Sequence, residues 1–148
     1  MSTYTQLLYH IIFSTMNRKC SLLEKRQEDL FKYIWGIIRN KKCHLYRING
    51  MEDHIHIATD IRPAIALSDF VKDIKVASHD WIKREKIFPH FEAWQKGYAT
   101  FTFSYRDKDG LINYIRDQKE HHKKTTYKEE LKKLLVEWGV EFDEKYLL

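Results

Sequence analysis

The sequence predicts an α+β fold in which an antiparallel sheet packs against helices. Short segments rich in aromatic and β-branched residues, which are typical of strands, alternate with longer segments whose apolar residues recur at helical spacing. Their order is strand, helix, strand, strand, helix, strand, followed by further helices. The chain has 148 residues, of which 43% are hydrophobic, so we expect residues 1–148 to form one domain with a buried core.

The first half of the chain predicts a strand, a helix and a hairpin. Residues 6–14 (QLLYHIIFS) are largely apolar on both faces, as in an interior strand. Ser21 and Glu24 have capping-box spacing, and the helix that follows to about Arg39 has its apolar stripe at Leu23, Leu30, Ile34, Ile37 and Ile38. Residues 43–48 and 54–61 are predicted strands, and their connection begins with Asn49-Gly50, a dipeptide typical of hairpin turns.

The second half predicts two more helices around a strand and a last helix after them. Ser68 is a candidate cap for a helix that runs to about Lys86. Residues 98–104 (YATFTFS) alternate as a half-buried strand does. A third helix is expected from about Lys108 to Lys123, and a capping box at residues 126–129 opens a helix that stops at Gly139.

This order of elements is the ferredoxin-like split βαβ arrangement, which RNA-recognition modules share. It predicts a four-stranded antiparallel sheet, or a larger one if two chains join, with helices on one face and extra C-terminal helices. The other face of the sheet is expected to be open for a site.

Charge and cysteine content narrow the function classes. The net charge is +5, from 26 basic and 21 acidic residues, and a moderately basic surface favours polyanions such as nucleic acid. Cys20 and Cys43 fit no metal or disulfide spacing, which predicts free thiols in a reducing cytoplasm. We expect no signal peptide and no membrane association, since the apolar runs are too short for a membrane span.

One candidate site lies in the segment MEDHIHIATD. In a strand His54 and His56 share one face, while Ile55 and Ile57 share the other, which suits the core. Imidazoles at positions i and i+2 are about 6–7 Å apart along the strand, so they are able to bind one metal ion together. A lone pair of this kind also occurs by chance on polar surfaces.

A second candidate lies on the predicted third helix. Tyr114 and Gln118 are four residues apart and therefore share a helical face, and His121 and His122 follow a turn later. Taken alone, this pattern also fits an amphipathic helix whose tyrosine packs at the edge of the core.

Together these features resemble the single-tyrosine HUH transposases of the smallest bacterial insertion sequences. The resemblance rests on Asp-His-hydrophobic-His at residues 53–56, followed some sixty residues later by Tyr-Ile-x-x-Gln at residues 114–118. The segments YHIIFSTMNRK, WQKGYATFTFS and FDEKYLL also resemble that family, so the likeness covers nearly the whole chain. One departure is Glu52, which stands where the family often has proline, and it affects the turn rather than the histidines.

The resemblance implies an enzyme that cuts and rejoins single-stranded DNA hairpins through a 5′-phosphotyrosine intermediate. It implies that Tyr114 is the nucleophile and that His54, His56 and Gln118 bind a divalent metal, Mg²⁺ or Mn²⁺. Two imidazoles and an amide add no negative charge, so the ion would keep its full charge for the phosphate. The family also implies a homodimer in which the tyrosine helix of one subunit can complete the site of the other.

Other parts of the chemistry are less defined by the sequence. No dedicated general base is evident, and His10 and His121 are candidates to assist Tyr114. Tyr98 or Tyr105 are candidates to stack on unpaired bases. Candidates for phosphate contact are Arg18, Lys19, Lys72, Lys75, Lys83, Arg84, Lys119, Lys123 and Lys124.

Two other functions remain open from the sequence. One is a non-catalytic module on the same fold that binds single-stranded nucleic acid. The other is a related HUH nuclease that its host retains for another strand-processing task, or a replication initiator. The DNA target, the physiological metal, the cis or trans placement of the tyrosine helix and the activity of this copy are also left open.

Overall fold

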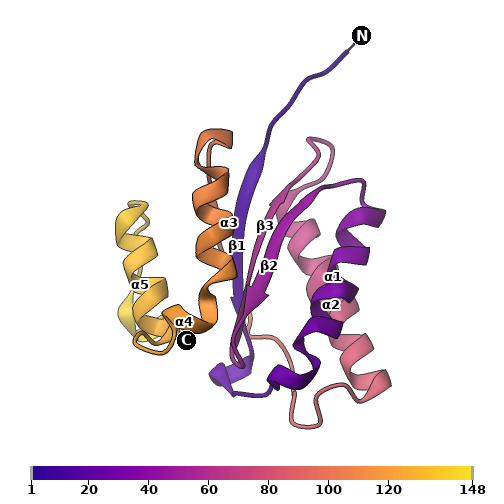
Figure 1. The fold of residues 1–148 in the computed structure, drawn as a ribbon, viewed down its shortest axis with the longest axis vertical. Coiled ribbons are helices and arrows are strands. Elements are labelled where there is room, and N and C mark those ends of the chain that lie inside the picture. The colour runs from indigo at the N-terminus through magenta and orange to yellow at the C-terminus, as the bar shows by residue number, and fades with distance from the viewer. Residues whose placement is uncertain (1, 148) are drawn as a thin grey trace.

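The computed structural model describes residues 2–147 and has one four-stranded antiparallel sheet between two layers of helices (Figure 1). The order of strands across the sheet is β2-β3-β1-β4, and all neighbouring strands are antiparallel. This is the order of the split βαβ arrangement, so the predicted fold class is confirmed. The strands are β1 (Leu8–Ser14), β2 (Leu45–Gly50), β3 (His54–Asp60) and β4 (Ala99–Thr102).

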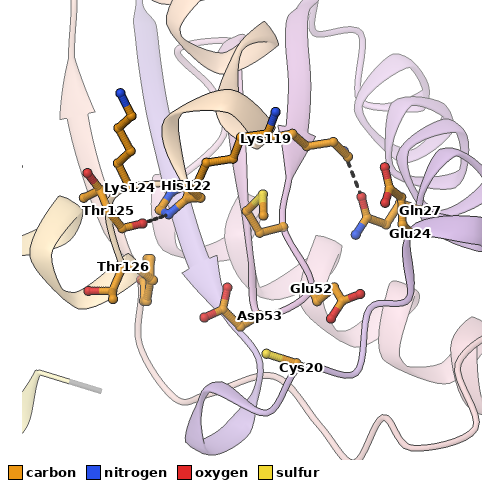
Figure 2. A pocket seen from close by; sticks show the side chains of 13 residues that line it. Cys20, Glu24, Gln27, Glu52, Asp53, Lys119, His122, Lys124, Thr125 and Thr126 are labelled. Carbon is orange, nitrogen blue, oxygen red and sulfur yellow. Dashed lines mark hydrogen bonds between the residues drawn. The ribbon is translucent and has the colours of Figure 1, made fainter.

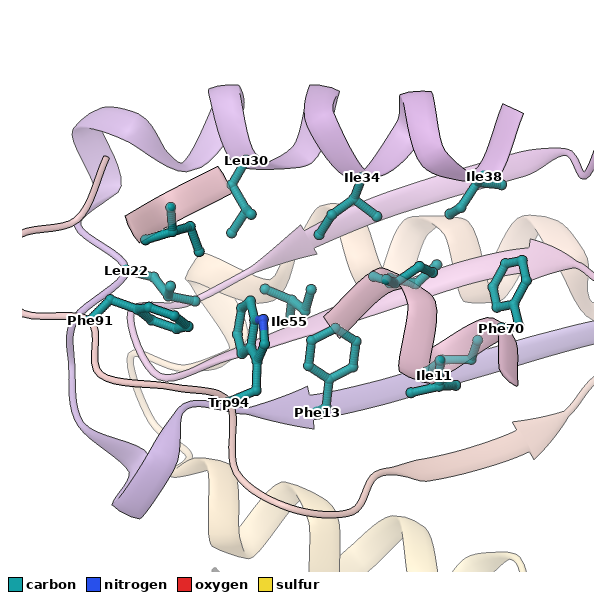
Figure 3. Close-up of a cluster of buried hydrophobic side chains, with 14 of the residues drawn as sticks. Ile11, Phe13, Leu22, Leu30, Ile34, Ile38, Ile55, Phe70, Phe91 and Trp94 are labelled. Carbon is teal, nitrogen blue, oxygen red and sulfur yellow. The ribbon is translucent and has the colours of Figure 1, made fainter. Parts of the chain in front are cut away.

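The first helical layer consists of α1 (Glu24–Asn40) and α2 (Leu67–Glu85). These helices cover one face of the sheet and enclose the larger core cluster, in which Ile34 of α1 and Phe70 of α2 meet Ile11 and Ile55 of the sheet (Figure 3). All four side chains are fully buried. The predicted stripe of α1 is confirmed at Leu30, Ile34 and Ile38, whereas Leu23 precedes the helix and is exposed.

The second layer covers the face that we expected to be open. It consists of α3 (Lys108–Arg116), α4 (Gln118–His121) and α5 (Tyr127–Glu137) (Figure 1). A smaller apolar cluster, which includes Ile12, Phe101 and Leu131, lies beneath α5. The open face was therefore wrongly predicted, because the C-terminal helices use the apolar residues on that side of β1 and β4.

Three short 3₁₀ segments complete the secondary structure: Met16–Arg18, Tyr105–Asp107 and Glu144–Tyr146. Within residues 2–147, every helix is too short or too polar to cross a membrane.

The predicted caps of the first two helices are wrong. Helix α1 is preceded by Leu23 and α2 by Ala66, and neither helix has a side-chain cap. Ser21 lies in a segment before the helix that is held by a long-range backbone hydrogen bond: the Leu22 amide donates to the carbonyl oxygen of Glu52 at 2.9 Å. Ser68 lies inside the first turn of α2 rather than before it.

The predicted hairpin between β2 and β3 is present, but its turn is formed by residues 51–53 and does not begin at Asn49. Asn49 and Gly50 belong to β2, where they pair with His56 and Ile55. A Cβ atom on Gly50 would lie 2.3 Å from the carbonyl oxygen of His54, so the close approach of β3 explains this glycine. The side-chain Nδ2 atom of Asn49 donates to the carbonyl oxygens of Ile115 and Arg116 at 3.0 and 2.9 Å.

The predicted third helix is broken where Asn49 binds it. Helix α3 ends at Arg116 and α4 begins at Gln118, with Asp117 between them outside helical geometry. The last helix follows its prediction more closely, since Thr126 and Glu129 form a capping box. Beyond α5, Gly139 has a φ of 68° and its amide donates to Val136, while Val140 donates to Leu135, as in a Schellman motif.

Candidate active site

Two adjacent positions on one face of β3 carry the histidine pair. His54 and His56 are fully buried beneath α4 and α5, while Ile55 and Ile57 point into the larger core cluster. The predicted division of faces is therefore confirmed. Because the second helical layer covers them, the two imidazoles lie in an enclosed site rather than on an open surface.

The imidazole of His54 is oriented by the residue before it. Its Nδ1 atom lies 2.7 Å from Oδ1 of Asp53, and a carboxylate only accepts, so Nδ1 carries the proton. The other nitrogen, Nε2, lies 3.3 Å from Oε1 of Glu130 and 3.4 Å from Oε1 of Gln118. Both of these oxygens are acceptors, and the lone pair of a neutral His54 would face them.

His56 and His122 face the same carboxylate. The Nε2 atoms of His56 and His122 each lie 3.0 Å from Oε1 of Glu130. Nδ1 of His122 lies 2.6 Å from the carbonyl oxygen of Thr125, so it is the donor there (Figure 2). Nδ1 of His56 lies 2.8 Å from Nε2 of His10, a buried residue of β1.

This convergence has the form of a metal site. One atom each from His54, His56, His122 and Glu130 lies within 4.8 Å of the others. Ligand atoms about 2.1 Å from a common metal ion are roughly 3.0–3.4 Å from one another, and each of the three Nε2 atoms lies 3.0–3.3 Å from Oε1 of Glu130. Each histidine also uses its Nδ1 atom for an outer partner, which is the usual arrangement of metal-binding histidines. The cluster could therefore hold a metal ion.

Tyr114 and Gln118 reach this cluster from α3 and α4 of the same chain. The Tyr114 hydroxyl donates a short hydrogen bond to Oε2 of Glu130, and Nε2 of Gln118 donates to the same oxygen at 3.0 Å. The Tyr114 ring meets the edges of His10 and His56 at centroid distances of 6.2 and 5.9 Å. The break at Asp117 does not separate the two residues, because both side chains turn toward Glu130.

Burial and the shared carboxylate of Glu130 shift the pKa values of the site residues. Burial lowers the pKa of His56 from 6.5 to about 4. For His54 burial also lowers the pKa, but the hydrogen bonds that its ring donates to the carboxylates of Asp53 and Glu130 outweigh it and the net pKa is raised. Burial and the neighbouring Glu130 raise the pKa of Tyr114. Burial opposes ionisation of Glu130, but bonds to the three histidines hold its pKa well below the usual range.

Two clefts approach the cluster from different sides. One, of about 730 Å³, lies beside His122 and Asp53 and carries Lys119, Lys123 and Lys124 on its wall (Figure 2). The other, of about 560 Å³, reaches Tyr114 and His10 and is also lined by Arg106, Gly110 and Trp138.

Many of the basic residues predicted to contact DNA lie away from these clefts. Lys72, Lys75, Lys83 and Arg84 belong to α2, in the layer on the opposite side of the sheet. Lys75 donates to the carbonyl oxygens of Gln95 and Gly97, and Lys83 donates to that of Phe91. Lys19 pairs with Glu92, while Lys119 lines the first cleft and binds the side chains of Gln27 and Asn49.

Three site residues were missed or left without a role by the sequence reasoning. Glu130 was not singled out, Asp53 was named only as part of the Asp-His-hydrophobic-His motif, and His122 was noted without a function. A signal for Glu130 does exist, because it is a carboxylate on the otherwise apolar stripe of Tyr127, Leu131 and Leu135 along α5. A charged residue on a buried stripe is rare unless it is paired.

Comparisons with known proteins point to one family. Residues 3–118 match the model of a family described as "Transposase IS200 like". Among curated proteins, the ISDra2 transposase TnpA of Deinococcus radiodurans is 26% identical over 119 residues, which cover 76% of this chain and 84% of that protein.

Solved structures agree on the fold. A putative transposase from Deinococcus radiodurans R1 has a TM-score of 0.61 and 24% identity, and the alignment covers 80% of this chain and 95% of that one. A REP-associated tyrosine transposase bound to a REP hairpin has a TM-score of 0.62 and 16% identity, with 82% and 74% covered. The family match ends at Gln118, so His122 and Glu130 lie outside it.

Proposed function

The chain belongs to the IS200-like transposase family, and from this premise we propose that it cleaves and rejoins single-stranded DNA with Tyr114 as the nucleophile. The observation that carries the proposal is the convergence of the Tyr114 hydroxyl, the Gln118 amide and the paired histidines on one buried carboxylate. A tyrosine that only packed at the core edge would need no such neighbours.

The proposed reaction is a transesterification. The hydroxyl oxygen of Tyr114 forms a bond to phosphorus while the bond from phosphorus to the 3′ oxygen breaks, and the 5′ end of the DNA stays on the tyrosine. The phenol loses one proton and the departing 3′ oxygen gains one. One phosphodiester replaces another, so the reverse reaction rejoins the strand without a nucleotide cofactor.

The chain positions this phenol but does not activate it alone. A phenol with its usual pKa of about 10 is already protonated at neutral pH, and burial beside Glu130 raises the pKa of Tyr114 further. A divalent cation would supply positive charge that favours both the phenolate and the developing charge on the phosphate. The resemblance implies that His54, His56 and Gln118 are its ligands and that the ion is Mg²⁺ or Mn²⁺. The imidazole nitrogens around Oε1 of Glu130 support a metal ion at that position.

We propose that the substrate is a DNA hairpin with an unpaired flank. A structural neighbour of this chain is bound to a REP hairpin, which supports the same class of ligand here. Lys123 and Lys124 lie on the wall of the cleft beside His122, which supports a role for them in contacting phosphates that lead to the site.

We propose that residues 1–148 form a single catalytic domain. Tyr114 reaches the histidines of its own chain, so a site completed in cis accounts for the geometry. The homodimer with exchanged tyrosine helices stays a prediction from the resemblance.

The deciding experiment uses a labelled hairpin with a single-stranded flank, incubated with the protein and Mn²⁺ or Mg²⁺. We expect a covalent protein–DNA adduct that EDTA prevents and that Tyr114→Phe abolishes. Tyr146→Phe is the matched control, because Tyr146 is exposed and lies outside the site. An adduct that persists in Tyr114→Phe would move the nucleophile to another residue. Salt-sensitive binding without any wild-type adduct would support the non-catalytic module instead.

A further inference from the structure

Glu130 is a buried carboxylate that the family match does not include. It lies on α5, twelve residues beyond the end of the match, and is 2% exposed. Tyr127, Leu131 and Leu135 on the same helix face pack into the apolar cluster below β1 and β4. A carboxylate in that row is costly to bury unless its charge is met by nearby groups.

The two oxygens of Glu130 have different surroundings. Oε1 faces the Nε2 atoms of His54, His56 and His122 at 3.0–3.3 Å. In His54 and His122 the proton is held on Nδ1 by an acceptor, so neutral rings present lone pairs to Oε1. The lone pairs of neutral His54 and His122 and of the carboxylate therefore face one another, which requires a cation among them or added protons. The Nε2 atom of His56 faces the same oxygen, and a cation there would select the tautomer that leaves its lone pair free.

Oε2, in contrast, faces hydrogen-bond donors. It accepts from the Tyr114 hydroxyl and from Nε2 of Gln118. One oxygen of Glu130 is therefore placed for a metal ion and the other for the hydroxyl that attacks.

We propose that Glu130 joins the metal to the nucleophile: Oε1 binds the divalent ion together with His54, His56 and His122, while Oε2 holds the Tyr114 hydroxyl beside it. The catalytic meaning of the second contact rests on the proposed function, whereas the ligand role does not. Glu130 makes this site different from one built only of His54, His56 and Gln118. A set of three imidazoles and one carboxylate favours Mn²⁺, Co²⁺ or Zn²⁺ over Mg²⁺.

The ligand role is tested without DNA. Metal-free protein is titrated with Co²⁺, whose visible absorption reports its coordination, and with Mn²⁺ by calorimetry. We expect Glu130→Gln and Glu130→Asp to weaken binding of both ions by at least about 10-fold, since one removes the charge and the other withdraws the oxygen. Glu129→Gln is the matched control, because Glu129 is exposed and glutamine also serves at that position of a capping box.

The contact with Tyr114 is tested by a double-mutant cycle on Co²⁺ affinity. If Glu130 links the hydroxyl to the ion, Tyr114→Phe should change the affinity severalfold in the wild-type background and much less in Glu130→Gln. Additive effects of the two substitutions would overturn the link.

Strand cleavage supplies the last comparison. We expect Glu130→Gln to reduce the rate of adduct formation at least about 100-fold at saturating Mn²⁺, with the hairpin still bound in EDTA.

Wild-type Co²⁺ affinity in both Glu130 variants would overturn the proposal, as would faster adduct formation in either of them, which would make the carboxylate an obstruction. If Glu130→Gln shows no cooperative unfolding transition, that variant is not properly folded, and the Glu130→Asp variant is used to test the proposal instead. If the wild type forms no adduct but its Co²⁺ affinity depends on Glu130, the proposed function fails and the ligand assignment stands.

Discussion

At the scale of single residues, the site depends on groups that contact the Nδ1 atom of each histidine and so orient its ring. Asp53 holds Nδ1 of His54, His10 holds Nδ1 of His56, and the carbonyl oxygen of Thr125 holds Nδ1 of His122. Each contact directs Nε2 toward Oε1 of Glu130. Outer contacts of this kind set both the ring orientation and the proton position of a ligand.

The contribution of these outer contacts to metal affinity can be measured at Asp53. We expect Asp53→Ala to weaken Mn²⁺ or Co²⁺ binding by about 10- to 100-fold, because the His54 ring loses the acceptor that holds its proton on Nδ1. Calorimetry on the folded variant measures the change, with the neighbouring Glu52→Ala as the control. Equal affinities in the two variants would show that the carboxylate of Asp53 does not orient His54.

The sequence predicted only part of this residue-level arrangement. His54 and His56 follow from the alternation of a strand, and Tyr114 and Gln118 from helical spacing, because both are local properties. The positions of His10, His122 and Glu130 depend on how β1, the turn after α4, and α5 pack around β3. No spacing within one element contains that information.

At the scale of elements, α5 is the helix whose start is most clearly encoded. The Thr126 side chain accepts from the Glu129 amide at 3.2 Å, and the Glu129 side chain accepts from the Thr126 amide at 3.2 Å. We expect Thr126→Ala to lower the free energy of unfolding by about 1 kcal/mol, measured by denaturant titration. Thr125→Ala keeps the backbone carbonyl that binds His122 and is the matched control; an equal loss in both variants would argue against the cap.

Element order was predictable and element ends were less so. The capping box of α5 and its glycine stop were recognised because they are made within a few residues. The start of α1, the position of the hairpin turn and the break at Asp117 depend on contacts with distant residues, such as those of Asn49 with Ile115 and Arg116. Those contacts override the local signals at Ser21 and Asn49-Gly50.

At the scale of the whole molecule, the site joins the sheet to the second helical layer. His54 and His56 come from β3, His122 from the turn after α4 and Glu130 from α5. The C-terminal helices were predicted, but their position over the second face could not be foreseen from the split βαβ pattern, which requires helices on only one face. The apolar residues of α5 and β4 were visible in the sequence, but their partners were not.

An ion bound between these layers should stabilise the entire fold. We expect Mn²⁺ or Co²⁺ at 100 times its Kd to add about 2.7 kcal/mol to the free energy of unfolding, seen as a higher melting temperature that EDTA reverses. The gain should shrink as the pH falls through the raised pKa of His54, because protonation of its Nε2 competes with the ion. An ion that leaves the melting temperature unchanged would contradict a site shared by β3 and α5.

The capping box has one more consequence, for changes in chain length. Each residue of an α-helix turns the next by about 100°, and Glu130 is the fourth residue after the cap at Thr126. A residue gained or lost between those two positions would rotate the carboxylate away from the imidazoles, whereas one gained beyond Leu135 would leave its direction unaltered. The permitted lengths of this segment are therefore set by the four-residue interval from Thr126 to Glu130.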